Sequence, residues 1–220
     1  MIPLLLVVIA VVSYYIGSVS SARLLAKYAL HRPIRKPGYV SYAAFDRMFG
    51  RKWSVALGAL DAVKTAAAVL IGGLLMLIPG SGFPVIGRLF AGMCVVIGDI
   101  HPYQTRLRGG HGVVCLITAL WLADWRVGLA ALAALVVVLA LSQYLSLACL
   151  AGCFAGVLAA WIFVEQEQMK GAAGLTVLVA FLFILWRYRS NVIRLVTKER
   201  PEPKVNWGKR PESRLRDDDF

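Results

Sequence analysis

The sequence predicts an all-α protein, a polytopic membrane bundle of about seven transmembrane helices. The chain has 220 residues, of which 59% are hydrophobic and 16% are charged, and its mean hydropathy is +0.70. A soluble domain of this size cannot bury so much apolar surface. Long apolar stretches recur along the whole chain, and basic residues gather between them. The net charge of +12 therefore indicates membrane topology, and we expect no nucleic-acid partner.

The apolar stretches define the spans in order. The first has no basic region before it and no clear cleavage site after it, so we expect a membrane helix and not a signal peptide. The second ends at the turn PGSGFP (79–84), which is rich in proline and glycine. The fourth is short, and the count falls to six if it does not cross. The polar SQY at 142–144 divides a stretch that is too long for one helix. The predicted spans are 2–28, 53–78, 84–100, 112–124, 127–142, 145–164 and 171–188.

Charge in the connecting segments predicts the orientation. Seventeen basic residues lie in one set of segments, made up of 31–52, 101–111, 142–144 and 189–220. Only two lie in the opposite set, made up of 79–84, 124–126 and 165–170. Because basic loops stay in the cytoplasm, we expect the N-terminus outside and the C-terminus inside. Residues 1–200 then form one membrane domain, and 201–220 a polar, disordered cytoplasmic tail. No internal repeat is visible.

Five polar clusters lie on the predicted cytoplasmic side, at or within the apolar spans, and each could have a structural or a functional role. A basic loop at 32–46 carries Arg35 and Lys36, which suit lipid headgroups. Asp61 and Lys64 lie within a span at i, i+3 spacing, on one helix face. Charges at that depth are functional or mutually paired, and the sequence leaves open whether these two form an ion pair.

The third cluster is GDIHPYQTRLRGGHGVV at 98–114. Its glycines allow backbone N–H groups to converge on an anion at a helix start, and Arg108 offers a forked donor for phosphate oxygens. Asp99 and His101 stand beside them. The fourth cluster, SQYLSL at 142–147, carries hydroxyls that on their own indicate turn chemistry. The fifth, 186–199, repeats basic and polar residues along one helix face, which is typical of an interfacial helix.

Taken together and in this order, the clusters resemble the bacterial acyl-phosphate:glycerol-3-phosphate acyltransferase family, known as PlsY. The matching pieces are GS at 17–18, IRKPG at 34–38, LDAVK at 60–64, RGGHGV at 108–113, QYLSL at 143–147 and YRSNVIRL at 188–195. The resemblance implies seven spans and a cytoplasmic site that transfers an acyl group from acyl-phosphate to glycerol-3-phosphate. It implies no cofactor and no metal, a place in phospholipid synthesis, and a bacterial inner membrane.

The chain departs from the family pattern at three places. The serine, glycine and asparagine run GSGNxGATN is GYVSYAAFD at 38–46. The histidine of the family's GH pair is Asp99, which would repel a phosphate. The lysine of GGKG is His111, which is largely uncharged at pH 7 unless its pKa is raised. We therefore expect a divergent member with altered motifs.

The resemblance and the clusters give the candidate site. The candidate catalytic residues are Asp99, His101 and His111, with Asp99 or His101 as general base. Backbone N–H groups at 109–113 would stabilise an anion or oxyanion. The candidate phosphate-binding and substrate-binding residues are Ser18, Arg35, Lys36, Lys64, Arg108, Gly109, Gly110, Gly112, Ser142, Tyr144, Asn191 and Arg194.

Three functions remain open at this point. The first is a divergent acyltransferase acting on glycerol-3-phosphate or a related acceptor, with the acyl chain between helices and open to the bilayer. The second is a catalytically inactive relative that binds lipid, acyl-phosphate or a membrane partner. The third is a transporter with Asp61, Lys64 and Asp99 along its pathway, which the lack of repeats disfavours. The sequence leaves the acceptor, the chain length and the oligomeric state open.

Overall fold

The protein is a bundle of helices in every part that the computed structural model describes, which is residues 2–31, 42–78, 84–103, 109–164 and 170–197. The helices are α1 (Ile2–Ser18), α2 (Ser21–Leu24), η1 (Leu25–Ala29), α3 (Tyr42–Phe49), α4 (Arg51–Leu77), α5 (Pro84–Ile100), α6 (Val113–Ala123), α7 (Trp125–Ser142), α8 (Leu145–Phe163) and α9 (Lys170–Thr197). Each predicted apolar stretch is helical, and the all-α fold is confirmed. The predicted tail 201–220 lies outside the described residues.

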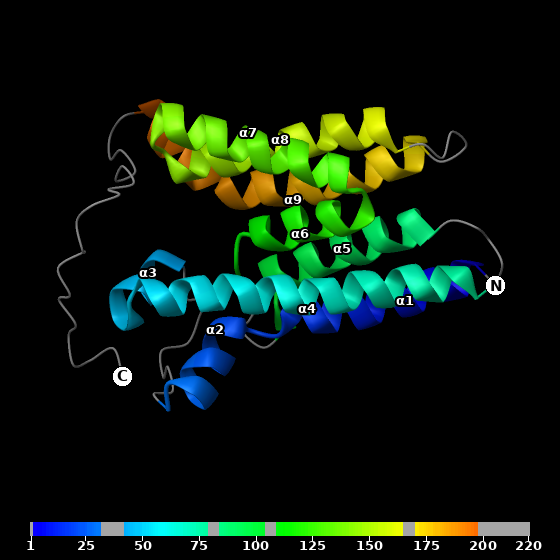
Figure 1. Cartoon of the computed structure of the whole chain (residues 1–220), viewed down its shortest axis with the longest axis horizontal. Coiled ribbons are helices and arrows are strands. Elements are labelled where there is room, and N and C mark those ends of the chain that lie inside the picture. The colour runs from blue at the N-terminus through cyan, green and yellow to red at the C-terminus, as the bar shows by residue number, and fades with distance from the viewer. Residues whose placement is uncertain (1, 32–41, 79–83, 104–108, 165–169, 198–220) are drawn as a thin grey trace.

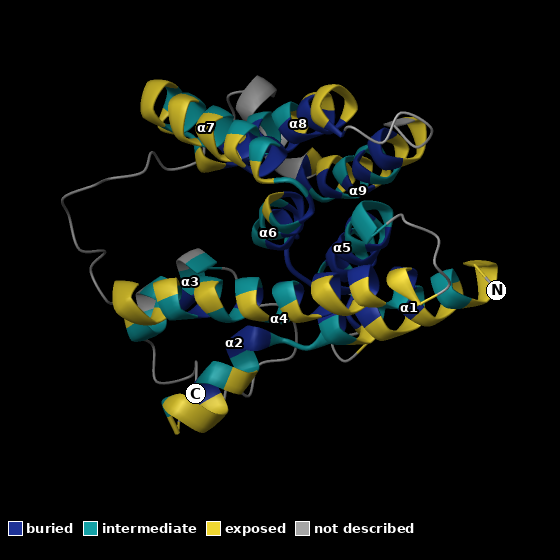
Figure 2. Ribbon diagram, turned by 45° about the vertical axis from the view of Figure 1, so that its right-hand side comes forward, coloured by how far each residue is buried: buried dark blue, intermediate teal, exposed yellow. Residues whose placement is uncertain are grey.

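The helices form layers (Figure 1). Helices α7, α8 and α9 lie on one side, α1 and α4 on the other, and α5 and α6 between them. Figure 2 shows buried residues concentrated on α5 and α6, while the outward faces of α1, α4 and α7 are exposed. Those faces are apolar, as Leu4, Val55 and Leu141 illustrate with exposed fractions of 71%, 67% and 82%. An apolar outer surface of this extent fits a protein that lies in lipid.

Helix length supports some of the predicted spans directly. Within the described residues, α4, α7, α8 and the Gly171–Arg189 part of α9 are long and apolar enough to cross a bilayer. The bent pair α1 and α2–η1 adds a fifth if it counts as one span. Helix α5 has 17 residues and α6 has 11, so the count of seven stays a prediction. Helix α1 begins at the end of the bundle opposite to that at which α9 ends, as an odd count requires (Figure 1).

The first predicted span is not one straight helix. It breaks after Ser18 and bends by 47° before α2 and η1. Glycine and serine residues favour such kinks, and the sequence here reads GSVSS at 17–21. Close packing against α5 holds the bend, because a Cβ on Gly17 would lie 2.4 Å from the Val95 carbonyl oxygen. The prediction of one continuous helix over 2–28 is therefore wrong at this point.

Helix α3 lies within the segment 31–52, which the sequence predicts to be a connecting loop. It is a short amphipathic helix at the end of the bundle where α4 begins (Figure 1). Phe45 is fully buried against Ala22, Ala26 and Leu57. This small apolar cluster fixes α3 against α2–η1 and α4, beside the bend of the first span.

Candidate functional site

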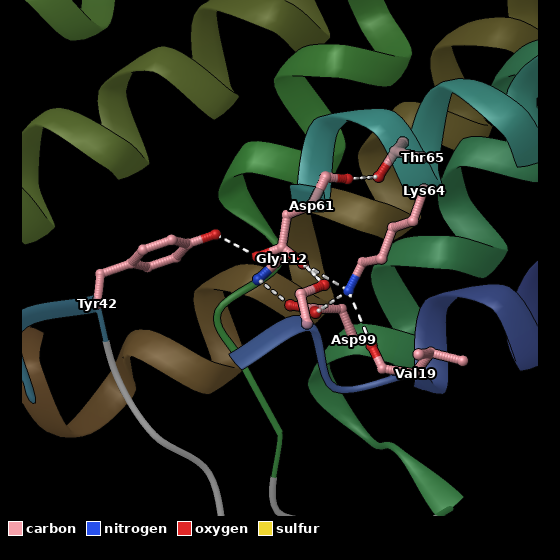
Figure 3. Close-up of polar contacts among 8 residues, drawn as sticks. Val19, Tyr42, Asp61, Lys64, Thr65, Asp99 and Gly112 are labelled. Atoms are coloured by element: carbon pink, nitrogen blue, oxygen red, sulfur yellow. Dashed lines mark hydrogen bonds and ion pairs between the residues drawn. The ribbon is translucent and has the colours of Figure 1, made fainter. Parts of the chain in front are cut away.

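The centre of the site is a lysine between two carboxylates (Figure 3). Lys64 Nζ lies 2.7 Å from Asp61 Oδ1 and 3.0 Å from Asp99 Oδ1. Asp61 and Lys64 share one face of α4, and Asp99 comes from the last turn of α5. All three side chains are largely buried, with exposed fractions of 11%, 11% and 18%. The sequence left open whether Asp61 and Lys64 form an ion pair. The structure shows this ion pair, and Lys64 forms a second one with Asp99.

Lys64 also reaches the break in the first span. Its ammonium donates at 3.2 Å to the carbonyl oxygen of Val19, which lies between α1 and α2. An ammonium has three donors, and three oxygens surround this one. A phosphate at Lys64 would have to replace one of these contacts, and the predicted phosphate role of Lys64 stays a prediction.

Asp61 is held from three directions. Ser21 Oγ donates to Asp61 Oδ1 at 2.5 Å, and the Tyr42 hydroxyl donates to Asp61 Oδ2. Thr65 Oγ1 donates to the Asp61 backbone carbonyl at 2.7 Å, one turn along α4. The carboxylate therefore connects α2, α3 and α4. Ser21 and Tyr42 were not among the predicted site residues, and Tyr42 lies inside the altered run at 38–46.

The glycine-rich segment folds back onto the end of α5. Gly109 N donates to the Ile100 carbonyl at 3.0 Å, and Gly110 N donates to the Asp99 carbonyl at 2.7 Å. Gly112 N donates to Asp99 Oδ2 at 3.2 Å. The expectation that these three N–H groups face an anion is therefore wrong in this conformation, because each already has a partner within the protein.

Packing and backbone geometry explain why glycines occur in this segment. A Cβ on Gly109 would lie 2.0 Å from the Asp99 carbonyl oxygen, a distance that no side chain can occupy. Gly112, which precedes α6, has a φ of 72° in the left-handed region. Close packing against α5 and a left-handed backbone conformation therefore account for the glycines of RGGHG. The presence of these glycines is not by itself evidence for an anion-binding site.

Arg187 of α9 binds the same segment from the other side. Its Nε donates to the Gly110 carbonyl at 3.1 Å, and its Nη2 donates to the Gly109 carbonyl at 2.6 Å. The sequence pattern places Arg187 in a basic stripe and does not identify this contact. A signal was available, since Arg187 follows an apolar run at the end of a span and must satisfy its donors there.

Both predicted histidines contact aromatic side chains of α9. The His101 ring stacks on Trp186 with centroids 5.4 Å apart, and Tyr14 donates to its backbone carbonyl at 3.0 Å. The His111 ring lies 4.6 Å from that of Tyr188. Burial, and then the charge of Arg187, lowers the pKa of His111 to about 4 and also lowers the pKa of His101. His111 is therefore uncharged at neutral pH and is no substitute for a lysine.

A pocket opens at the bend of the first span. Its empty volume is about 360 Å³, including the space at its mouth. The described residues that line it are Gly17, Ser18, Val19, Ser20, Ser21, Ala22, Leu57, Asp61, Asp99, Pro102, Gly109 and Gly110. Ser18 is buried, and its Oγ has no hydrogen-bond partner among the described residues. The pocket thus brings together four predicted site residues, which are Ser18, Asp99, Gly109 and Gly110.

Other predicted residues lie elsewhere. His101, His111, Lys64 and Gly112 are not among the described lining residues, although Lys64 and Gly112 touch Asp99. Ser142 Oγ donates to the Val138 carbonyl at 2.7 Å and accepts from Tyr144 N at 3.3 Å.

Ser142 and Tyr144 thus form the turn between α7 and α8, which is the turn chemistry that their hydroxyl groups indicate on their own. Arg35, Lys36 and Arg108 lie outside the described residues. So do the side chains of Asn191 and Arg194, whose backbone belongs to α9.

Comparison with known proteins identifies the family. The family model for glycerol-3-phosphate acyltransferases matches residues 7–198. The glycerol-3-phosphate acyltransferase of Gluconobacter oxydans is 33% identical over 210 residues, covering 93% of this chain and 96% of the relative. That of Thermoanaerobacter pseudethanolicus is 32% identical over 192 residues, covering 86% and 91%.

Two solved structures share the fold. Both are crystal structures of PlsY (YgiH), an integral membrane glycerol 3-phosphate acyltransferase, in a glycerol 3-phosphate form and a lysophosphatidic acid form. Each is 22% identical to this chain and covers 91% of it, and the chain covers 96% and 95% of the two, with TM-scores of 0.73 and 0.74. The expected resemblance is confirmed, and this chain belongs to the glycerol-3-phosphate acyltransferase family of integral membrane proteins.

Proposed function

We propose that this protein transfers an acyl group from an acyl-phosphate to the hydroxyl of glycerol-3-phosphate or a related small acceptor. The observation that carries the proposal is the pocket at the bend of the first span. Its wall combines the orphan hydroxyl of Ser18 with the carboxylates of Asp61 and Asp99. Hydroxyl and carboxylate oxygens at a membrane-embedded pocket suit an acceptor that carries hydroxyl groups.

In this reaction the acceptor oxygen attacks the acyl carbonyl carbon, the bond from that carbon to the phosphate oxygen breaks, and inorganic phosphate leaves. The acceptor proton passes to a protein base or to the leaving phosphate. Asp99 is the best placed of the three candidate catalytic residues, because it lines the pocket and His101 and His111 do not. An ionised carboxylate has about four lone-pair sites, so Asp99 can accept a bond from the substrate beside those from Lys64 and Gly112.

The phosphate groups need positive charge that the described lining residues of the pocket do not offer. The described charges at the pocket are two carboxylates and one ammonium that already contacts three oxygens. We therefore assign the phosphates of donor and acceptor to Arg108, which directly precedes Gly109, and to Arg35 and Lys36 of the basic loop after the first span. Asn191 and Arg194 are assigned to the same substrates, on the basis of the family motif.

The proposed setting is the cytoplasmic face of a bacterial inner membrane. Seven spans, an outer N-terminus and an inner C-terminus follow from the distribution of basic residues. The acyl chain of the donor would lie between helices, against the apolar surfaces that the bundle presents to lipid. The product would enter phospholipid synthesis.

The test is turnover by the purified protein in detergent or in vesicles. Palmitoyl-phosphate and glycerol-3-phosphate are supplied, and lysophosphatidate and inorganic phosphate are measured together. Equal release of both supports the proposal. Arg108→Ala should lower turnover, whereas Arg126→Ala should not, since Arg126 pairs with Asp124 at the turn between α6 and α7 and neither residue lines the pocket. No turnover with glycerol-3-phosphate or with a panel of small polyols and amines contradicts it.

A second function is a catalytically inactive protein that binds lipid or acyl-phosphate. One observation favours it: the N–H groups of Gly109, Gly110 and Gly112 and the ammonium of Lys64 all have partners within the protein. Binding of acyl-phosphate without its consumption would support this function over the first.

A further inference from the structure

Arg187 connects the last helix to the wall of the pocket. It lies on α9, and its forked guanidinium donates to two successive carbonyl groups, those of Gly109 and Gly110, at 2.6 and 3.1 Å. A planar fork with two parallel donors is a geometry that arginine provides and lysine does not. The contact joins residues 78 and 77 positions apart in the chain.

Gly109 and Gly110 are thereby held on both sides. Their N–H groups donate to carbonyl oxygens at the end of α5, at 3.0 and 2.7 Å. Their own carbonyl groups accept from Arg187. Both glycines are buried and both line the pocket. The position of this wall is therefore set jointly by the end of α5 and by one side chain of α9.

Arg187 also brings a permanent charge to the segment. The neighbouring ring of His111 contacts that of Tyr188, and the guanidinium lies close enough to lower the pKa of both His101 and His111. An arginine stays charged at any physiological pH. The segment thus has a fixed positive charge behind its glycines, although His111 itself carries none at neutral pH.

We propose that Arg187 is a positioning residue for acyl transfer, which fixes the Gly109–Gly110 wall of the pocket and places a permanent positive charge behind these two glycines. The inference rests on the proposed function. Arg187 acts through the two glycines, because it is not itself among the described lining residues. Its loss should therefore lower the rate of the chemical step more than the affinity for the acceptor.

The experiment compares Arg187→Gln and Arg187→Lys with Arg189→Gln in the full-length protein. Arg189 lies two residues further along α9, is exposed, and sits over the Trp186 ring at 5.0 Å. It makes a matched control, because it loses the same charge without a described contact to the glycines. Three kinds of measurement are made: steady-state kinetics giving kcat and KM for the acceptor, amide hydrogen exchange at Gly109 and Gly110, and histidine titration by NMR.

Arg187→Gln should lower kcat by about tenfold or more, the effect of losing one hydrogen bond to a charged group, with a change in KM of less than about threefold. Exchange at Gly109 and Gly110 should accelerate by a similar factor, and the pKa of His111 should rise. Arg187→Lys keeps the charge but not the fork, so it should fall between the wild type and Arg187→Gln. If Arg187→Gln does not fold, Arg187→Lys is compared with Arg189→Gln instead.

Several results overturn the inference. An increase in KM with unchanged kcat would mean that Arg187 binds substrate directly. Equal effects of Arg187→Gln and Arg189→Gln would mean that only surface charge matters. If the wild type shows no turnover with any acceptor, the proposed function fails. Exchange and titration then decide the inference, and unchanged values in Arg187→Gln reject the positioning role.

Discussion

The ammonium of Lys64 on α4 lies 3.0 Å from the Asp99 carboxylate on α5. This contact joins the two helices at the point where the first span bends and the pocket opens. It also explains how Asp99 is tolerated at a buried helix end, because a buried carboxylate needs a charged partner or several donors.

Removal of the lysine tests the strength of this arrangement. Lys64→Met leaves Asp61 and Asp99 buried without their shared cation, and we expect the free energy of unfolding to fall by about 3–5 kcal/mol. Arg126→Met is the matched control, because Arg126 pairs with Asp124 but is 36% exposed, and it should cost about 1 kcal/mol or less. Unfolding by SDS in mixed micelles measures both. Equal losses in the two variants would contradict a central role for Lys64.

Close packing of α1 on α5 predicts a second effect. A Cβ on Gly98 would lie 2.4 Å from the Tyr14 carbonyl oxygen, so Gly98→Ala should push the helices apart and cost about 1–3 kcal/mol. Gly171→Ala should cost nothing or stabilise α9, because no atom lies within 4 Å of a Cβ there. Melting temperatures in detergent compare the two. A melting temperature for Gly98→Ala equal to that of the wild type would mean that α1 and α5 are less tightly packed than described.

The hydroxyl of Tyr42 holds α3 to the charged centre. Tyr42→Phe removes one donor to Asp61 and should destabilise the protein by about 1.5–3 kcal/mol, the usual range for a hydrogen bond to a charged group. Tyr28→Phe is the control, because Tyr28 is 66% exposed. Proteolysis of the segment around α3 should also accelerate in Tyr42→Phe alone. Unchanged cleavage would show that Phe45 and its apolar contacts suffice to hold α3.

The pKa of His111 predicts a pH dependence. It is lowered to about 4 by burial and by Arg187, below the value of about 6.5 in an unfolded chain. Between these values the unfolded state binds more protons, so stability falls as the pH drops from about 6.5 toward 4.

The chain has three histidines, so NMR titration with single His→Gln variants can assign each one. His111→Gln should flatten the loss of stability in this pH range. A measured pKa of His111 near 6.5 would contradict the buried environment described here.

Local patterns were enough to predict much of the fold. Apolar length located the helices, and the i, i+3 spacing placed Asp61 beside Lys64. The bend after Ser18 was not predictable in the same way, because it depends on the contact of Gly17 with Val95 of α5. The role of α3 was missed for a similar reason, since only the folded chain brings Tyr42 to Asp61.

The site was harder to predict than the fold. Motif order placed Ser18, Asp99, Gly109 and Gly110 together, and all four line the pocket. The assumption that glycine N–H groups are free for an anion failed, because the sequence does not reveal that they pair with the end of α5. Long-range partners such as Arg187 require the structure.

The central claim is that the pocket at the bend carries out acyl transfer through Asp99. The most direct measurement is the rate of lysophosphatidate formation by Asp99→Asn, with Asp124→Asn as control, because Asp124 pairs with Arg126 between α6 and α7 and does not line the pocket. We expect a loss of about 100-fold or more in kcat for Asp99→Asn, the usual contribution of a positioned acid or base, with the rate referred to the folded fraction, because the substitution also weakens the contact with Lys64. Asp124→Asn should retain the wild-type rate. A wild-type rate in Asp99→Asn would contradict the account.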